Sequence, residues 1–230
     1  ASDQLWQHGP AMMWLALAGL LAAATSYWSS GLSYGLAALT RPPTAIMAAA
    51  TGLAIGIRQR DWRPVLKIGV GAALGVAAVI GYNAVVFGEP CISGGYGDSV
   101  SDRAISSSPL WWAGNTLRAL FDPRRGLFVW SPFLLVLLPG IRQAWRVAPD
   151  WVRGSAIGGV LYLALQYKVN RHSGGKGFYG YRYPLEALVV LAPLLMLAFR
   201  EWVAVRPRAV KAFVVLAVLS VTLQAVVALR

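Results

Sequence analysis

The chain has 230 residues, of which 57% are hydrophobic and only 13% are charged, and its formal net charge is +12. About a quarter of the residues of an ordinary soluble domain are charged, and such a domain does not reach the mean hydropathy of +0.55 found here. The composition therefore excludes a typical soluble domain and predicts an integral membrane protein. The single cysteine, Cys91, excludes an intrachain disulfide.

Six long apolar runs predict membrane-spanning helices, because about 20 apolar residues in helical form cross the hydrocarbon core of a bilayer. The runs occupy residues 10–28, 66–87, 130–147, 152–167, 184–199 and 209–229. The predicted fold class is all-α: a polytopic membrane protein of about six transmembrane helices, forming a single transmembrane domain over residues 1–230.

Residues 31–57 are also apolar, but Arg41, Pro42 and Pro43 interrupt them. Two consecutive prolines remove two backbone donors, and each remaining half is too short to cross a membrane as a helix. We interpret this stretch as a Pro-broken re-entrant pair. One long kinked span is the alternative, since neighbouring helices can satisfy the freed carbonyls.

Gly71 and Gly75 lie four residues apart in the run 66–87 and so share one helix face. Small residues at this spacing let another helix approach closely. We expect that helix to belong to the same chain rather than to a second copy.

Three short connections between the runs hold eleven of the 21 Lys and Arg residues. They are Arg58, Arg60, Arg63 and Lys67; Arg142, Arg146 and Arg153; and Arg200, Arg206, Arg208 and Lys211. By the positive-inside rule these connections are cytoplasmic, and alternation then places the long connections 88–129 and 168–183 outside. The positive charge thus follows a membrane topology, and no nucleic-acid partner is predicted.

The two external connections nevertheless carry eight cations: Arg103, Arg118, Arg124, Arg125, Lys168, Arg171, Lys176 and Arg182. One interpretation is that long external connections escape the rule and that their side chains reach for lipid headgroups. The other is an anion site at the external membrane surface, because the planar donor fork of arginine suits phosphate.

Within the first external connection, residues 110–121 have apolar side chains at helical spacing and two adjacent tryptophans. They predict an interfacial helix with Asn115 and Arg118 on its wet side. The turn that follows places Arg124 and Arg125 at headgroup depth.

The second external connection combines glycines, tyrosines, four cations and His172. Neither His8 nor His172 has a cysteine or carboxylate at metal-ligand spacing, so no metal site is predicted and a divalent cation is not indicated as a cofactor. Glu186 begins a span, where an unpaired charge is costly, and we expect it to pair with Arg182 one turn earlier.

Five strings, in order, resemble a known family. They are LWQHGPA from Leu5, GLSYGLAALTRPPTAIM from Gly31, YNAVVFGEP from Tyr82 with GGYG at Gly94, RRGLFVWSPFLLVLLPG from Arg124 and GFYGYRYPLEALVVLAPLL from Gly177. Together they resemble bacterial GT-C superfamily glycosyltransferases, of the polyprenyl- or dolichyl-phosphate-mannose protein mannosyltransferase-like group (glycosyltransferase family 39-like).

The resemblance implies transfer of a sugar from a polyprenyl-phosphate carrier to an acceptor on the external face of a bacterial plasma (inner) membrane. The family's catalytic carboxylate usually lies in a first external loop that is missing here, so we expect a C-terminal portion without the catalytic base. The implied partners are membrane lipid and the lipid-linked sugar donor. The residues that we expect at the lipid phosphate or the sugar are Arg182, Arg124, Arg125, Tyr96, Lys176, His8, Arg41 and Glu186.

Two other functions stay open at this point. A transporter or flippase for lipid-linked or anionic substrates is favoured if Arg41 and Glu186 face a central cavity. A non-catalytic membrane subunit, whose external connections only bind headgroups, is the other alternative.

Overall fold

Helices form all the secondary structure in the part of the chain that the computed structural model describes, residues 7–92, 102, 105–174 and 180–228. The predicted all-α class is therefore confirmed. In chain order the elements are α1 (His8–Ala23), α2 (Tyr27–Thr40), η2 (Pro42–Thr44), α3 (Ala45–Gln59), α4 (Arg63–Phe87), α6 (Pro109–Phe121), α7 (Leu127–Trp130), α8 (Phe133–Leu137), η3 (Leu138–Gly140), α9 (Ile141–Val147), α10 (Asp150–Val169), α11 (Pro184–Ala198), η4 (Phe199–Val203) and α12 (Pro207–Ala228).

Two of the described helices, α4 and α12, are long and apolar enough to cross a membrane by length and composition. The helix α1 is apolar but shorter. These are fewer spans than the six apolar runs suggest, and two of those runs do not fold as single unbroken helices.

Local breaks divide these two runs. The run 10–28 ends as a helix at Ala23, where Thr25 adopts a left-handed backbone conformation (φ 57°), and the following residues belong to α2. The run 130–147 is divided into short helices at Pro132 and Pro139, each of which lacks the N–H that an unbroken helix needs.

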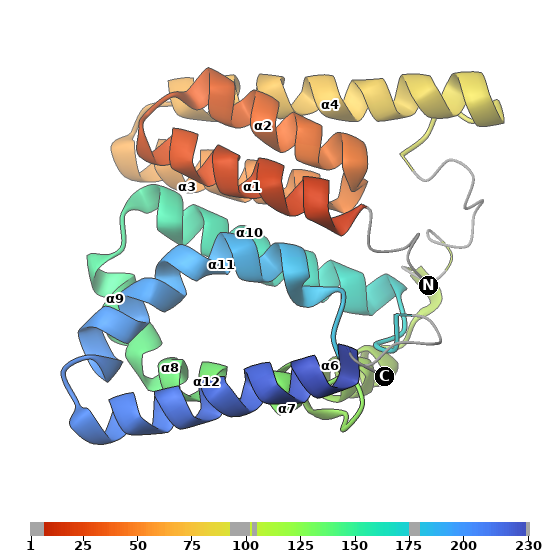
Figure 1. The fold of residues 1–230 in the computed structure, drawn as a ribbon. Helices are drawn as coiled ribbons and strands as arrows, with labels where there is room; N and C mark the ends of the chain where they lie inside the picture. The colour runs from red at the N-terminus through yellow and green to blue at the C-terminus, as the bar shows by residue number, and fades with distance from the viewer. Residues whose placement is uncertain (1–6, 93–101, 103–104, 175–179, 229–230) are drawn as a thin grey trace.

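The break at Arg41 is confirmed. The helix α2 ends at Thr40, a single 3-10 turn follows over the two prolines, and α3 runs back in the opposite direction (Figure 1). The stretch 31–57 is therefore a helical hairpin rather than one kinked span. Arg41 itself has an extended backbone (φ −144°, ψ 91°), which turns its side chain away from the axis of α2.

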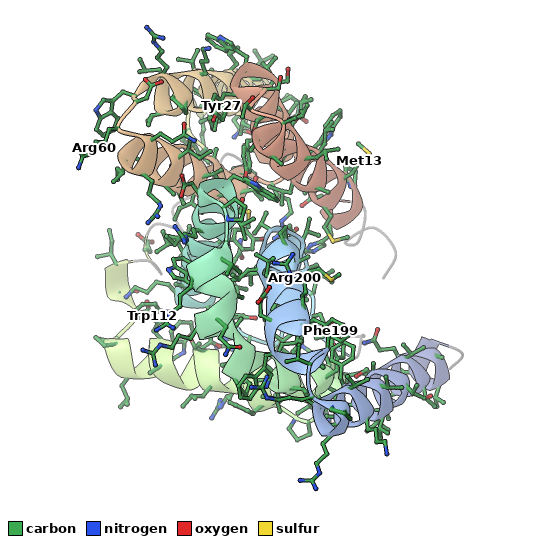
Figure 2. All side chains as sticks on the ribbon, turned by 90° about the vertical axis from the view of Figure 1, so that its left-hand side faces the viewer. Met13, Tyr27, Arg60, Trp112, Phe199 and Arg200 are labelled. Atoms are coloured by element: carbon green, nitrogen blue, oxygen red, sulfur yellow. The ribbon has the colours of Figure 1, made fainter. Side chains whose placement is uncertain are left out.

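The three basic connections lie at one end of the molecule, at the left of Figure 1, where α3 meets α4, α9 meets α10 and α11 passes into α12. Figure 2 views the molecule from that end and labels Arg60 and Arg200. The ends of α4 and α10, the start of α11 and the helix α6 lie at the opposite end. The fold thus separates the short basic connections from the two long ones, as the charge pattern predicts.

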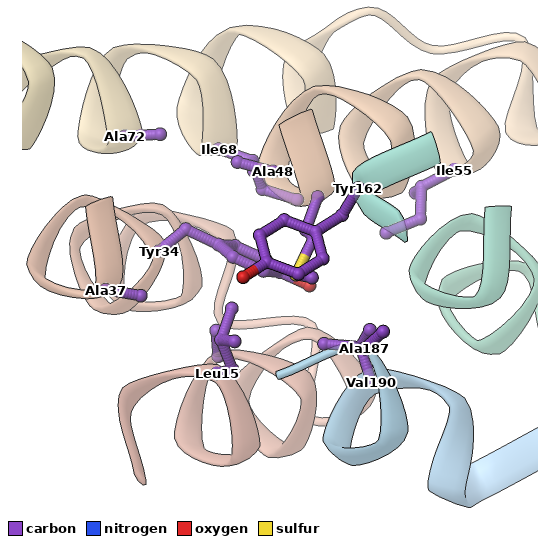
Figure 3. Close-up of a cluster of buried hydrophobic side chains, with 12 residues drawn as sticks. Leu15, Tyr34, Ala37, Ala48, Ile55, Ile68, Ala72, Tyr162, Ala187 and Val190 are labelled. Carbon is purple, nitrogen blue, oxygen red and sulfur yellow. The ribbon is translucent and has the colours of Figure 1, made fainter. Parts of the chain in front are cut away.

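A buried core joins α1, α2, α3, α4, α10 and α11 (Figure 3). Tyr34 of α2 and Tyr162 of α10 are its largest fully buried side chains. The Tyr34 hydroxyl lies 3.0 Å from Thr51 Oγ1 in α3, so its polar atom is satisfied within the core.

The helix α4 packs on α2 through glycines. A Cβ atom on Gly35 would lie 2.7 Å from the Gly71 carbonyl oxygen, and one on Gly71 would lie 2.6 Å from the Gly31 carbonyl carbon. Neither distance leaves room for a side chain. The expectation that Gly71 and Gly75 pack against a helix of the same chain is confirmed.

Candidate functional site

Glu186, in the first turn of α11, is the centre of a buried polar cluster. Its Oε1 atom lies 2.6 Å from His8 Nδ1 and 3.0 Å from Arg41 Nε, and its Oε2 atom accepts a hydrogen bond of 3.1 Å from the Tyr162 hydroxyl. The Glu186 side chain is 0% exposed and that of Arg41 is 12% exposed. A buried carboxylate is costly unless it is paired, and here a guanidinium supplies the opposite charge.

His8 links the two charged groups. Arg41 NH1 lies 2.8 Å from His8 Nε2, and because a guanidinium can only donate, Nε2 accepts this hydrogen bond. The other ring nitrogen, Nδ1, lies 2.6 Å from Glu186 Oε1, so the imidazole sits between the guanidinium and the carboxylate. The cluster joins the start of α1, the break after α2, the middle of α10 and the start of α11.

This geometry corrects the expected partner of Glu186. Among the described residues, the carboxylate is paired with His8 and Arg41 rather than with Arg182. The Arg182 guanidinium instead lies 5.3 Å from the centre of the Tyr183 ring, within the range of a cation–π contact.

The second cluster is built where the two long connections meet. The Arg125 guanidinium donates to the Ser173 carbonyl oxygen, and the Gly180 N–H donates to the Arg124 carbonyl oxygen at 2.9 Å. These two contacts fasten the turn after α6 to the connection that leads into α11. They bring the Arg124 and Arg125 pair to the chain segment that carries Arg182.

Asp122 shapes that turn. Its Oδ1 atom accepts the N–H groups of Arg124 (2.8 Å) and Arg125 (3.0 Å). Gly126 follows, and a Cβ atom there would lie 2.6 Å from the Asp122 nitrogen, so the turn is closed tightly enough to require glycine.

Asn115 of α6 clamps the same two connections. Its Nδ2 atom donates to the carbonyl oxygens of Tyr167 and Asn170, both at 2.7 Å, and its Oδ1 atom accepts the N–H of His172 at 2.8 Å. The helix expected over residues 110–121 is present as α6, and Arg118 is exposed on it as predicted. Asn115, however, is buried instead of facing water, because the second connection covers it.

The segment from Gly180 to Glu186 connects the two clusters. The Tyr181 hydroxyl lies 2.8 Å from Ser131 Oγ, and the Tyr183 ring packs edge-on against Tyr167. Three of the expected site residues, His8, Arg41 and Glu186, meet in the buried cluster, and Arg124, Arg125 and Arg182 lie at the connections. Tyr96 and Lys176 lie outside the described residues.

Sequence reasoning missed Tyr162, Asn115 and Asp122 as parts of the site. The signal for Tyr162 was available, because a tyrosine within an apolar run carries a hydroxyl that needs a partner when it is buried. Asn115 and Asp122 act through backbone groups of a distant or following segment, and their residue types alone do not identify those partners.

His172 lies beside the second cluster, with its Nε2 atom 3.8 Å from Asp122 Oδ2. Partial burial lowers the pKa of His172, Asp122 acts in the opposite direction, and the positive charges of Arg118 and Arg125 lower the pKa further. Burial is the largest of these effects, so the lowered pKa of His172 reflects chiefly the desolvation of its imidazole.

In the described part of the chain, no three His, Cys, Asp or Glu side chains gather where they could hold one metal ion. The chemistry that this arrangement offers is recognition of an anion by arginine donors, next to a buried and charge-compensated carboxylate. Comparisons with protein-family models, with characterised proteins and with solved structures find no match to the chain.

Proposed function

We propose that this chain is the carrier-binding membrane portion of a glycosyltransferase that moves a sugar from a polyprenyl-phosphate carrier to an acceptor on the external membrane face. The observation that carries the proposal is the joining of the two long connections through Arg124, Arg125, Ser173 and Gly180. The joined segments lie at the end of the molecule opposite the short basic connections (Figure 1).

The proposed membrane placement follows from the separation of the short basic connections and the two long connections to opposite ends of the molecule. The basic end is cytoplasmic under the positive-inside rule, and the end with α6 is external. The six proposed spans are α1, α4, the α7–α9 series, α10, α11 and α12, and the α2–α3 hairpin is the re-entrant pair. The length and hydropathy of α4 and α12 support two of these spans directly.

In the proposed reaction an acceptor hydroxyl attacks the anomeric carbon of the sugar, and the bond from that carbon to the carrier phosphate breaks. The negative charge that develops on the leaving phosphate is stabilised by arginine donors that are already in position. Arg182, Arg124 and Arg125 are assigned this role, because they are the cations held at the joined connections. The proton of the acceptor hydroxyl goes to a general base, which the proposal assigns to no residue of this chain.

The buried cluster has a positioning role in this proposal. Glu186 has no exposed surface, so it cannot contact a carrier without rearrangement. By fixing the first turn of α11 against α1, the contacts of Glu186 with His8 and Arg41 hold the segment in which Arg182 lies. The same enclosure gives no support to a transporter, for which Arg41 and Glu186 would have to face a cavity.

The test is binding of tritiated polyprenyl phosphate by the purified full-length protein, followed by transfer from the corresponding polyprenyl-phosphate sugar. Loss of one charged donor of this kind lowers turnover by about 100-fold or more, so Arg182→Ala should lower transfer by that factor. Arg182→Lys should restore only part of it, because lysine cannot form a bidentate fork.

Arg171→Ala is the matched control. It removes an exposed arginine from the same connection while keeping Arg124, Arg125 and Arg182 in place. Equal transfer and equal carrier binding by Arg182→Ala and the unchanged protein would remove the assignment of the carrier site.

A further inference from the structure

An open hollow of about 580 Å³ lies between α6 and the turn that follows it. Its lining residues are Leu117, Arg118, Phe121, Asp122, Pro123 and His172. A second hollow of about 360 Å³ extends along α6 and shares Arg118 with the first. The two hollows therefore place one arginine between two mostly apolar spaces.

The first hollow combines groups that suit a phosphate with groups that suit an acyl chain. Arg118 is exposed and forms no ion pair with any residue that the structure describes, so its donors are available at the surface. Leu117 is 59% exposed and Phe121 is 53% exposed. In water such a surface is unfavourable, whereas lipid chains would cover it.

Asp122 is the one acidic group in the lining, and both of its carboxylate oxygens already have polar neighbours. Its Oδ1 atom accepts two backbone N–H groups of the turn, and its Oδ2 atom faces His172. The charges that face His172 are thus Asp122 on one side and Arg118 and Arg125 on the other. Within the lining the charges of Arg118 and Asp122 cancel, and Arg125, which acts on His172 from beyond the lining, leaves the surroundings positive, which favours an anionic occupant.

We propose that this hollow binds an anionic phospholipid of the surrounding leaflet. Arg118 and His172 take the headgroup phosphate, and the acyl chains lie along Leu117 and Phe121. The exposed Trp111 beside the second hollow places this helix at headgroup depth, where tryptophan is enriched. The inference rests on the membrane placement proposed above and is independent of sugar transfer.

The apolar walls distinguish a lipid from a free phosphate. A soluble anion would gain only the contacts with Arg118 and His172 and would leave Leu117 and Phe121 in water. A phospholipid covers those side chains and keeps its phosphate at the same depth as the arginine. The site should therefore prefer phosphatidylglycerol strongly over glycerol phosphate, although both carry a phosphodiester or phosphate group.

The chain has two histidines, so the occupant can be observed at the site itself. We would label the imidazoles with nitrogen-15, place the protein in nanodiscs of phosphatidylcholine with or without phosphatidylglycerol, and record the histidine signals. His172→Gln assigns the two signals, and the buried His8 is the internal reference. Phosphatidylglycerol should move the His172 signal and leave that of His8 in place.

Bound phosphatidylglycerol, counted by native mass spectrometry, should fall about tenfold in Arg118→Gln, because a charge-assisted contact is lost. Arg171→Gln removes the same charge outside the hollow and should cost less than about fivefold, the effect of one cation near an anionic leaflet. Equal losses in both variants would show diffuse attraction and overturn the proposal, as would a His172 shift produced equally by millimolar glycerol phosphate.

The test of the phospholipid site can be distinguished from the test of the carrier site. Arg182→Ala should lose polyprenyl phosphate and keep phosphatidylglycerol, and Arg118→Gln should do the reverse. Parallel loss of both lipids in Arg118→Gln would mean that the hollow belongs to the carrier site, which would also overturn this proposal while leaving the proposed function standing.

Discussion

His8 Nδ1 lies 2.6 Å from Glu186 Oε1, so α1 and α11 are joined at their first turns by a contact that is almost completely buried. Arg41, carried on the break between α2 and α3, completes the charge balance. Because this contact is buried, water cannot easily replace a partner that is lost. Its removal should therefore destabilise the fold more than the loss of any surface ion pair.

The first prediction concerns this contact. His8→Ala leaves a buried carboxylate with one polar partner fewer and should lower the free energy of unfolding by about 1–3 kcal/mol, the usual cost of removing a partner from a buried polar group. Glu201→Gln is the control, because Glu201 pairs with the exposed Arg200 and should cost less than about 1 kcal/mol. Thermal unfolding of each variant in detergent measures both losses of stability. Similar values for the two variants would contradict a buried, coupled cluster.

The second prediction concerns the close packing of α2 on α4. Gly75→Ala places a Cβ atom against the Gly35 backbone and should cost about 1–3 kcal/mol, as overpacking does. Gly81→Ala in the same helix meets nothing within 4 Å. It should be neutral or stabilise the helix by up to about 1 kcal/mol. If Gly75→Ala were as stable as Gly81→Ala, the two helices could not be this close.

The helices and their breaks could be predicted because their causes are local. Apolar runs predicted helices throughout, and the proline pair after Arg41 marked the place where α2 ends. The same reasoning was incomplete for residues 130–147, because Pro132 and Pro139 divide that run as effectively as the proline pair divides residues 31–57. A run of apolar residues predicts burial in lipid more reliably than it predicts one unbroken helix.

The contacts of the site could not be read in the same way, because they join residues that are far apart in the sequence. Arg182 is one turn from Glu186, which made it the obvious partner, yet the fold brings His8 and Arg41 to the carboxylate. Asn115 lies on the polar face of α6, as its spacing indicates. Only the path of the second connection shows that this face is covered.

The third prediction tests that covering. Asn115→Ala leaves two carbonyl oxygens and one N–H without their partner and should cost about 1–3 kcal/mol. Amide exchange should rise in α6 and in the residues that follow α10. Thr116→Ala is the control, since the Thr116 hydroxyl donates only to Trp112 within its own helix. Unchanged exchange in Asn115→Ala would mean that other contacts hold the two connections together.

The fourth prediction concerns the protonation of His172. Its pKa in the folded protein is lowered from the ordinary value of 6.5, chiefly by burial, so the unfolded chain binds this proton more readily. The contribution of His172 to the free energy of unfolding is therefore fully present above about pH 6.5 and declines as pH falls through the window between the two pKa values.

Arg118→Gln removes a positive charge that lowers the pKa of His172 and should raise that pKa, whereas Asp122→Asn should lower it. Opposite shifts in a nitrogen-15 titration are the expected result, and shifts in the same direction would contradict the electrostatic assignment.

The fifth prediction tests the sidedness of the membrane placement. Cys91 follows the end of α4 at the end of the molecule that we propose to be external, and its carbonyl oxygen is held by Asn83 Nδ2 at 2.7 Å. A membrane-impermeant maleimide should label Cys91 in sealed right-side-out vesicles. The matched variant is Gln59→Cys in a Cys91→Ser background, which places the only thiol at the opposite end and keeps every charge that sets topology.

That thiol should react with the maleimide only after the vesicles are opened. Labelling of both thiols from outside would contradict a membrane between the two ends, and labelling in the reverse order would place the arginine cluster in the cytoplasm and remove the external carrier site.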